Sequence, residues 1–309
     1  MLLPYDLFEL RRSAEEARRA SKLSNIYHAG QSSIWDGREV LADLVAQHGK
    51  PQMEHGLRQA LEPLFAVLLW GEYAAWRISA QLADRIEHLE GKMAASSQVH
   101  DEARHFYVLH DYMELVGMKA RRPDRHAEAV LRMVLETDSL THKLLGMQLL
   151  IESVALTLFH LLRRQRLEPV LTELLVYYEK DEARHVGLGI QFLPALFATM
   201  GRRQRAALVA FQLRIVFREL AGLKVLEPGL RRAGISAREV FEDAMARQER
   251  ALETMLAEID IHKRDAVGEG IRRIAIALAD ATFPPEPTSV FARARRVFRT
   301  LSVGSELGI

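Results

Sequence analysis

Cysteine is absent from this chain of 309 residues, and neither sign of charge dominates it. Without cysteine, disulfides, thiolate metal sites, iron–sulfur clusters and cysteine nucleophiles are all excluded. Lysine and arginine number 42 against 41 acidic residues, so the formal net charge is only +1. Such a balance argues against nucleic acid as a main partner, because no basic excess exists to displace phosphate counterions.

Long uncharged apolar runs are also lacking, and none approaches the roughly 18 residues of a membrane span. The first residues, MLLPYDLFELRR, become charged too early for the apolar region of a signal peptide. We therefore expect a soluble, cytoplasmic protein. Glycine-rich phosphate loops, dinucleotide fingerprints and nucleophile elbows are missing too, so any reducing equivalents must come from an external electron donor.

Apolar residues recur every three or four positions, which predicts an all-α chain. Helices are expected over 53–91, 94–116, 128–166, 169–200 and 201–226, with a connector at 117–124, a break at 227–229 and a further helix after 236. The stretch 128–166 is also compatible with a separate short helix at its start. These patterns divide the chain into an N-terminal helical extension (1–52), a four-helix bundle (53–200), C-terminal helices packing on that bundle (201–281), and a proline-rich linker with a basic terminal helix (282–309).

The terminal segment 289–301 is amphipathic, with apolar residues on one face and four arginines around much of the rest. A basic amphipathic helix of this kind is one pattern of membrane-surface contact. Docking on the protein's own bundle, or on a second subunit of a homodimer, is the interpretation we favour because the pattern is generic.

The pentapeptide DEARH occurs twice, at Asp101–His105 and again at Asp181–His185. A glutamate precedes each copy at a matching distance, since Glu72 stands as far before Glu102 as Glu152 stands before Glu182. The interval between these two outlying glutamates therefore equals the interval between the two pentapeptides. One pattern, Glu followed by Glu-x-x-His, occurs twice.

Helical geometry explains this spacing. Residues i and i+3 share one face of a helix, so the glutamate and histidine of each DEARH can reach a common point. The outlying glutamate returns to the same height as its partner if a hairpin turns near the midpoint between them. Residue 167, beside Pro169, is the second midpoint, and residue 87, slightly before Gly91, is the first. Four such helices would direct four carboxylates and two imidazoles into one bundle.

Apolar neighbours of Glu72 and Glu152 place these carboxylates in the bundle interior. Two like charges 4 Å apart repel by about 4 kcal/mol at an effective dielectric constant of about 20. Two divalent cations would cancel four carboxylate charges. Oxygen-rich sites with one imidazole per ion suit iron or manganese, and the absence of thiolates disfavours structural zinc. A single Glu-x-x-His is usually a solvated pair, but the matching upstream glutamates make coincidence improbable.

At these residues the sequence resembles the ferritin-like di-iron carboxylate superfamily, over roughly Pro63 to Met200. This four-helix template is a known arrangement for two metal ions. The resemblance implies an all-α, ferritin-like four-helix bundle with a dinuclear metal centre, extended by helices at both ends. By this resemblance, Glu72 and Glu152 would each be a carboxylate ligand of one ion. Glu102 and Glu182 would bridge the two ions, and His105 and His185 would be the terminal nitrogen ligands. Behind them it places residues that hold the ligands, namely Asp101, Arg104, Asp181 and Arg184; a solvated surface role is equally compatible with the two arginines.

Departures from particular subfamilies narrow the choice. Leu109 stands where a radical-storing ribonucleotide reductase subunit would have tyrosine, and Tyr178 stands where arylamine N-oxygenases have a further histidine. Ala74 and Met147 occupy the positions of the valine–tyrosine crosslink of ligand-binding oxidases. Pure iron storage would leave about 110 residues after Gly201 unexplained.

The resulting hypothesis is a dioxygen-activating non-haem oxidase or oxygenase with two iron ions, or one manganese and one iron, and dioxygen as co-substrate. Its substrate would be a hydrophobic small molecule such as a fatty acyl chain or an aldehyde. The residues expected to line the channel are Leu69, Trp76, Phe106, Leu149, Leu156, Phe159 and Phe192. The alternatives are a non-catalytic ferritin-like metal- or ligand-binding protein, a manganese–iron ligand-binding oxidase, and an N-oxygenase of an amine.

Overall fold

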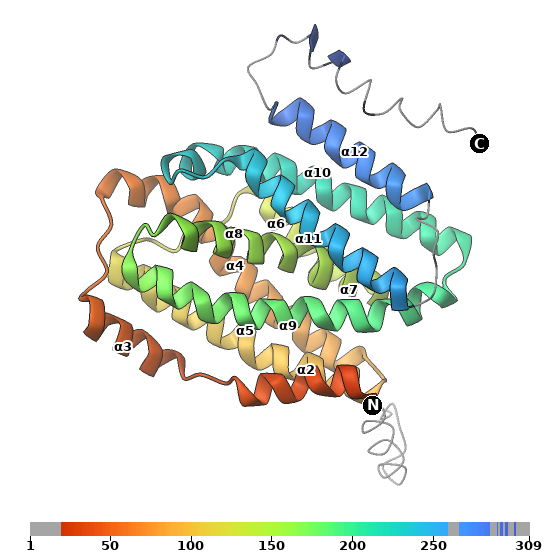
Figure 1. Cartoon of the computed structure of the whole chain (residues 1–309), viewed down its shortest axis with the longest axis horizontal. Coiled ribbons are helices and arrows are strands. Elements are labelled where there is room, and N and C mark those ends of the chain that lie inside the picture. The colour runs from red at the N-terminus through yellow and green to blue at the C-terminus, as the bar shows by residue number, and fades with distance from the viewer. Residues whose placement is uncertain are drawn as a thin grey trace.

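The described part of the chain contains helices and no strands (Figure 1). A computed structural model describes residues 20–258 and 266–284, together with positions 289, 291, 292, 294, 295 and 300. Its elements are α2 (Ser21–Ser32), α3 (Gly37–His48), α4 (His55–Arg85), α5 (Leu89–Val116), α6 (Arg125–Glu136), α7 (Leu140–Leu144), the π-helix η2 (Leu145–Ile151), α8 (Glu152–Gln165), α9 (Pro169–Thr199), α10 (Arg202–Arg232), α11 (Ala237–Glu258) and α12 (Ala266–Thr282).

Two helical hairpins, α4–α5 and α8–α9, form the four-helix core. The chain turns at residues 86–88 and 166–168, so both turns are centred on the midpoints 87 and 167. Gly91, which the sequence placed near the first turn, lies inside α5, where a Cβ would meet Ile86 Cγ2 at 2.9 Å. The equal arms bring Glu72 level with Glu102 and Glu152 level with Glu182.

The helical stretch predicted over 128–166 is divided in the structure, and a separate short helix lies at its start, as the sequence allowed. α6 ends at Glu136, and the chain then continues as α7, η2 and α8. π-Helices are rare, occur mostly as single turns inside α-helices and are frequently found at functional sites. Here η2 ends immediately before Glu152, so the irregular turn adjusts the approach of this carboxylate to the bundle interior.

The break predicted at 227–229 is wrong, because α10 runs without interruption to Arg232. Pro228 lies in the last turns of α10, where it leaves the carbonyl of Lys224 without its usual helical donor, so packing has to offset that loss. Close packing holds this end of the helix. A Cβ on Gly229 would lie 2.2 Å from the carbonyl oxygen of Ala60 on α4, and Leu226 and Leu230 are buried.

The remaining helices cover opposite sides of the core (Figure 1). α2 and α3, red and orange in the picture, lie along α5 and α9. α10 and α11, cyan to blue, pack over α4, α6 and α8, and α12 lies on α10. The predicted terminal segment 282–309, including the amphipathic stretch 289–301, lies largely outside the described residues, as do residues 1–19 of the N-terminal extension.

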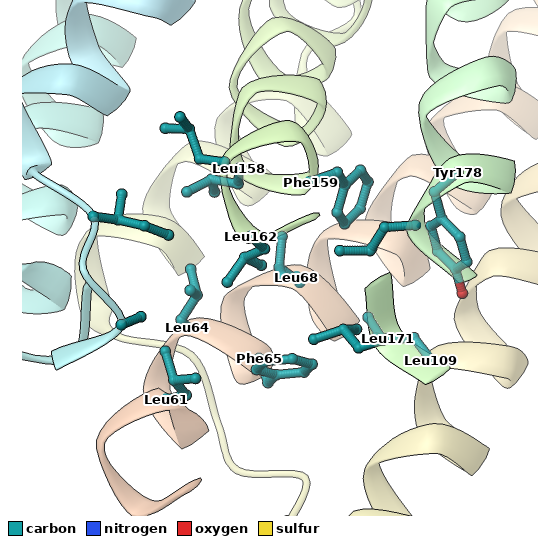
Figure 2. Close-up of a cluster of buried hydrophobic side chains, with 14 of the residues drawn as sticks. Leu61, Leu64, Phe65, Leu68, Leu109, Leu158, Phe159, Leu162, Leu171 and Tyr178 are labelled. Carbon is teal, nitrogen blue, oxygen red and sulfur yellow. The ribbon is translucent and has the colours of Figure 1, made fainter. Parts of the chain in front are cut away.

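Leucine side chains from α4 and α8 fill the space between the two hairpins (Figure 2). Leu64 and Leu68 of α4 lie beside Leu158 and Leu162 of α8, and all four are buried. The Phe159 ring stands edge-on to Tyr178 of α9, with 5.3 Å between ring centroids. This apolar cluster borders the polar centre on one side.

One helical stretch, Leu140–Gln165, has the length and hydropathy of a membrane-crossing helix. The search of the sequence for apolar runs without charged residues did not identify this stretch, because Glu152 interrupts it. In the structure 72% of its most apolar window is buried inside the bundle, which is typical of a core helix.

Candidate metal centre

Six side chains from the four core helices converge in the bundle interior, and each is at most 4% exposed. α4 and α8 contribute one carboxylate each, while α5 and α9 contribute a carboxylate and an imidazole each. They are the six expected from the sequence: Glu72, Glu102, His105, Glu152, Glu182 and His185.

The six residues form two overlapping sets with the geometry to hold metal ions. One set consists of Glu72, Glu102, His105 and Glu182, and the other of Glu102, Glu152, Glu182 and His185. Within each set the ligand atoms lie within 4.8 Å of one another. Because Glu102 and Glu182 belong to both sets, they occupy the position of carboxylates that bridge two ions.

Each imidazole directs one nitrogen at the carboxylates and the other at an aspartate. His105 Nδ1 lies 3.2 Å from both Glu72 Oε2 and Glu182 Oε1, and its Nε2 lies 3.1 Å from Asp181 Oδ2. An aspartate in this position fixes the orientation of a ligand histidine and raises its basicity.

His185 repeats this arrangement with the helices exchanged. Its Nδ1 is 2.9 Å from Glu182 Oε2, 3.1 Å from Glu102 Oε1 and 3.6 Å from Glu152 Oε1. Its Nε2 lies 3.4 Å from Asp101 Oδ2. The histidine of each DEARH thus contacts the aspartate of the other copy.

Two arginines link the two aspartates into one network. Arg104 donates to Asp101 at 2.6 Å and to Asp181 at 2.8 Å. Arg184 donates to Asp181 at 2.5 Å and to Asp101 at 3.1 Å. The Arg104 side chain is buried and that of Arg184 is 14% exposed. The arginines therefore face the centre, and the alternative of a solvated surface role does not describe them.

The sequence did not single out Trp35, which joins the same network from the α2–α3 connection. Its indole N–H donates to Asp181 Oδ2 at 2.9 Å. The Arg104 guanidinium lies 4.5 Å from the Trp35 ring centroid, within cation–π distance. This side of the centre is consequently closed by a charged, hydrogen-bonded wall.

Gln98 and Gln148 form a chain of hydrogen bonds that ends at the candidate ligands. The sequence did not single out either residue. Gln98 Nε2 donates to Glu152 Oε1 at 2.8 Å and to Glu102 Oε1 at 3.0 Å. Gln148 Nε2 donates to Gln98 Oε1 at 2.8 Å. In the second repeat the position that corresponds to Gln98 is Tyr178, whose ring stacks on His105 at 4.3 Å. The two halves of the centre are therefore chemically different.

Burial and mutual charge set the protonation of the cluster. Burial raises the pKa of Glu72 to about 8 and that of Glu152 well above its ordinary value. Burial alone would lower the pKa of His105, but the hydrogen bonds to Asp181 and the neighbouring glutamates raise it well above its ordinary value. The pKa of His185 is shifted in the same direction by the charges of the glutamates. Without a metal ion, protons balance the carboxylate charges.

The aspartates are held in the charged form. Burial opposes ionisation of Asp181, but its contacts with His105 and Arg184 lower its pKa far below the usual range. The hydrogen bond to His185 likewise outweighs burial and lowers the pKa of Asp101. Both aspartates can thus accept hydrogen bonds from ligand imidazoles throughout the neutral pH range.

A cavity of about 150 Å³ adjoins the centre between α4, α6, α8, α10 and α11. Glu72, Glu102 and Glu152 border it. Most of its wall is apolar, with contributions from Leu68, Ala75, Val130, Leu158, Val216 and Leu223. None of the seven expected channel residues lines it.

The expected channel residues lie elsewhere. Leu69, Leu149 and Phe159 are packed in the hydrophobic core. Trp76 and Phe106 belong to an aromatic group on the other flank of α4, with Trp70 and Tyr73. Leu156 and Phe192 are half-buried away from the cavity wall, and Phe192 contacts His88.

No protein-family model and no curated protein matches the chain. Solved structures do match it. A variant of R2-like ligand-binding oxidase with an aerobically reconstituted Fe/Fe cofactor aligns with a TM-score of 0.60 at 14% identity, covering 75% of this chain and 92% of the other. Two variants with Mn/Fe cofactors, reconstituted aerobically and anaerobically, align with TM-scores of 0.56 and 0.57 at 15% and 17% identity. Both alignments cover 79% of this chain and 94% of the other.

This chain has the ferritin-like fold. The expected all-α, ferritin-like architecture is therefore confirmed. Within that fold, the donor set tests whether a metal pair fits. Glu102 Oε2 is buried without a hydrogen-bond partner, and each overlapping set offers three carboxylates and one imidazole. An orphaned buried oxygen costs free energy unless a cation or donor meets it. Oxygen ligands with one nitrogen suit iron or manganese, so the residues fit two such ions.

Proposed function

We propose that this protein binds two iron ions, or one manganese and one iron, and uses dioxygen to oxidise a hydrophobic small molecule. The observation that supports this proposal most directly is the pair of buried ligand sets that share Glu102 and Glu182 and border an apolar cavity. The solved structures with the same fold carry Fe/Fe or Mn/Fe cofactors, which supports this choice of metals. When bound, such a metal pair supplies the electrons that activate dioxygen.

The protein's own residues would hold, orient and shield this chemistry. Asp181 and Asp101 fix the outer nitrogens of His105 and His185 and leave the inner nitrogens free to bind metal. Gln98 holds Glu152 beside the bridging carboxylates. The apolar cavity wall excludes bulk water, which protects a reactive site from side reactions.

The cavity favours a substrate with a substantial apolar part. Fatty acyl chains and aldehydes fit this description, and an external electron donor would complete the cycle. N-oxidation of an amine is a further alternative from the sequence. Cytoplasmic location and a homodimer stay predictions.

The test is to reduce the iron-loaded protein without air, admit dioxygen and follow near-ultraviolet absorption with and without added fatty acids, aldehydes or amines. We expect an oxygen-dependent absorption change whose decay is accelerated by the true substrate class. The Glu182→Ala variant is the control and should show no such change.

Ferric absorption that accumulates at the same rate with every added compound would contradict the enzyme and favour a non-catalytic metal- or ligand-binding protein. Product analysis by mass spectrometry provides a second readout. An oxidised product formed only with dioxygen and the wild-type chain supports the proposal.

A further inference from the structure

Glu219 and Asp124 are acidic residues in the mostly apolar wall of the cavity, away from the glutamates of the metal centre. Glu219 extends from α10 and has no hydrogen bond or ion pair among the residues whose side chains the structure describes. Burial raises the pKa of Glu219 to about 7. A carboxylate facing an apolar cavity without a partner is costly, so a ligand that supplies a hydrogen-bond donor would stabilise it.

Asp124 borders the same cavity and has one carboxylate oxygen without a partner. Its Oδ1 accepts from the backbone N–H groups of His126 and Ala127 at 2.8 and 3.3 Å and caps α6. Its Oδ2 is buried behind the cavity wall and has no hydrogen-bond partner, so a small movement of the side chain would be needed for it to meet a ligand. A Cβ on Gly222, one turn after Glu219 on α10, would lie 3.8 Å from Asp124 Oδ1. The two acids therefore belong to neighbouring parts of the wall.

The charge of the wall favours a cation. Arg218 also lines the cavity, and its Nη1 lies 3.4 Å from His126 Nδ1. Two divalent ions would neutralise the four glutamates of the metal centre, which leaves two acids and one arginine to set the charge of the cavity. An ammonium group meets two acidic side chains here, whereas a carboxylate would meet one arginine against two acids.

We propose that the cavity binds an amine whose ammonium group is held by Glu219 and Asp124 and whose apolar body lies along the leucine and valine wall. Such an amine would be the substrate of the proposed enzyme. Only this last step, from bound ligand to substrate, rests on the proposed function. The recognition itself depends on α6 and α10 and can be measured without turnover.

The test is calorimetric titration of the full, iron-loaded chain, kept free of dioxygen, with n-octylamine, n-octanoate and n-octanol. We expect octylamine to bind at least about 10-fold more tightly than the other two, the factor given by one charge-assisted hydrogen bond. Glu219→Gln should weaken octylamine binding about 10-fold and remove its advantage over octanol. Asp124→Asn, which keeps an oxygen to cap α6, should weaken it in the same direction.

Glu227→Gln is the matched control, since Glu227 lies on the same helix outside the cavity and pairs with Lys224 at 2.5 Å. It should bind octylamine like the wild type. Equal or tighter binding of octanoate, or unchanged octylamine binding in Glu219→Gln, would overturn the proposal. Binding with no dioxygen reaction would refute only the proposed enzyme, and a dioxygen reaction without amine preference would refute only this ligand class.

Discussion

Trp35 donates its indole N–H to Asp181 Oδ2 at 2.9 Å. The same carboxylate oxygen lies 3.1 Å from Nε2 of His105. A residue of the N-terminal extension is thus connected to a candidate ligand by one shared oxygen. Through this contact, the packing of α2 and α3 on the bundle reaches the metal centre.

Asp181→Asn should weaken metal binding about 10- to 100-fold, because a partner that orients a ligand histidine typically contributes that much. Titration with Mn²⁺ in competition with a chelator measures the affinity. Trp35→Phe should act in the same direction but more weakly, since it removes only one donor to Asp181. Asp43→Asn changes an exposed aspartate of α3 and serves as the control. Equal affinities in Asp181→Asn and the control would contradict this role.

Gln98→Leu should affect the two metal positions unequally. Its amide contacts Glu152 and Glu102. The ion held by Glu152 and His185 should therefore bind more weakly, while the ion held by Glu72 and His105 is retained. Paramagnetic resonance of Mn²⁺-loaded protein distinguishes the results, because an isolated ion gives a signal that a coupled pair does not. Gln59→Leu, at an exposed position of α4, should behave like the wild type. Loss of both ions together would refute the inequality.

Metal loading should release protons. Burial raises the pKa of Glu72 to about 8 and that of Glu152 well above its ordinary value, and the neighbouring carboxylates raise the pKa values of His105 and His185. Two divalent ions compete with the protons that these groups hold, so we expect a net release of protons on metal loading. Affinity should consequently rise with pH through about pH 8, where Glu72 loses its proton. Calorimetry in buffers of different ionisation enthalpy counts the protons, and a release near zero would show that the cluster is already deprotonated.

Gly71→Leu should fill the cavity without disturbing the fold. Gly71 lines the cavity, and a Cβ built there meets no atom within 4 Å. Replacing a mid-helix glycine also improves helix propensity by up to about 1 kcal/mol. We expect an unchanged or higher melting temperature and loss of octylamine binding, whereas Gly71→Ala should retain binding. Full ligand binding in Gly71→Leu would show that the ligand lies elsewhere.

The six candidate ligands could be predicted because their spacing is a property of helices. Two hairpins with equal arms must bring the residues equally distant from each turn to the same height, and i, i+3 pairs must share a face. The exact repetition of the pattern in the second hairpin then leaves little freedom. Trp35 and Gln98 carried no such signal, since each reaches the centre through contacts that depend on how distant segments pack.

The channel could not be located for a related reason. On α4 the sequence selected the flank of Glu72 that carries Leu69 and Trp76, whereas the cavity follows the flank of Leu68, Gly71 and Ala75. Adjacent residues are rotated by about 100° around a helix, so Leu68 and Leu69 lie on different flanks of α4. Both flanks carry apolar residues next to Glu72, and the sequence does not show which of them borders the cavity. The cavity lies where α10 and α11 pack on the bundle. The sequence predicted that these C-terminal helices pack on it but not which side they cover. The mistaken break at 227–229 concerned the same part of the fold.

Diffraction from crystals of the iron-loaded protein at the iron absorption edge tests the central claim most directly. We predict two anomalous peaks in the bundle interior with Glu102 and Glu182 between them. One peak should lie against Glu72 and His105, and the other against Glu152 and His185. A single peak, or none among these six side chains, would contradict the account.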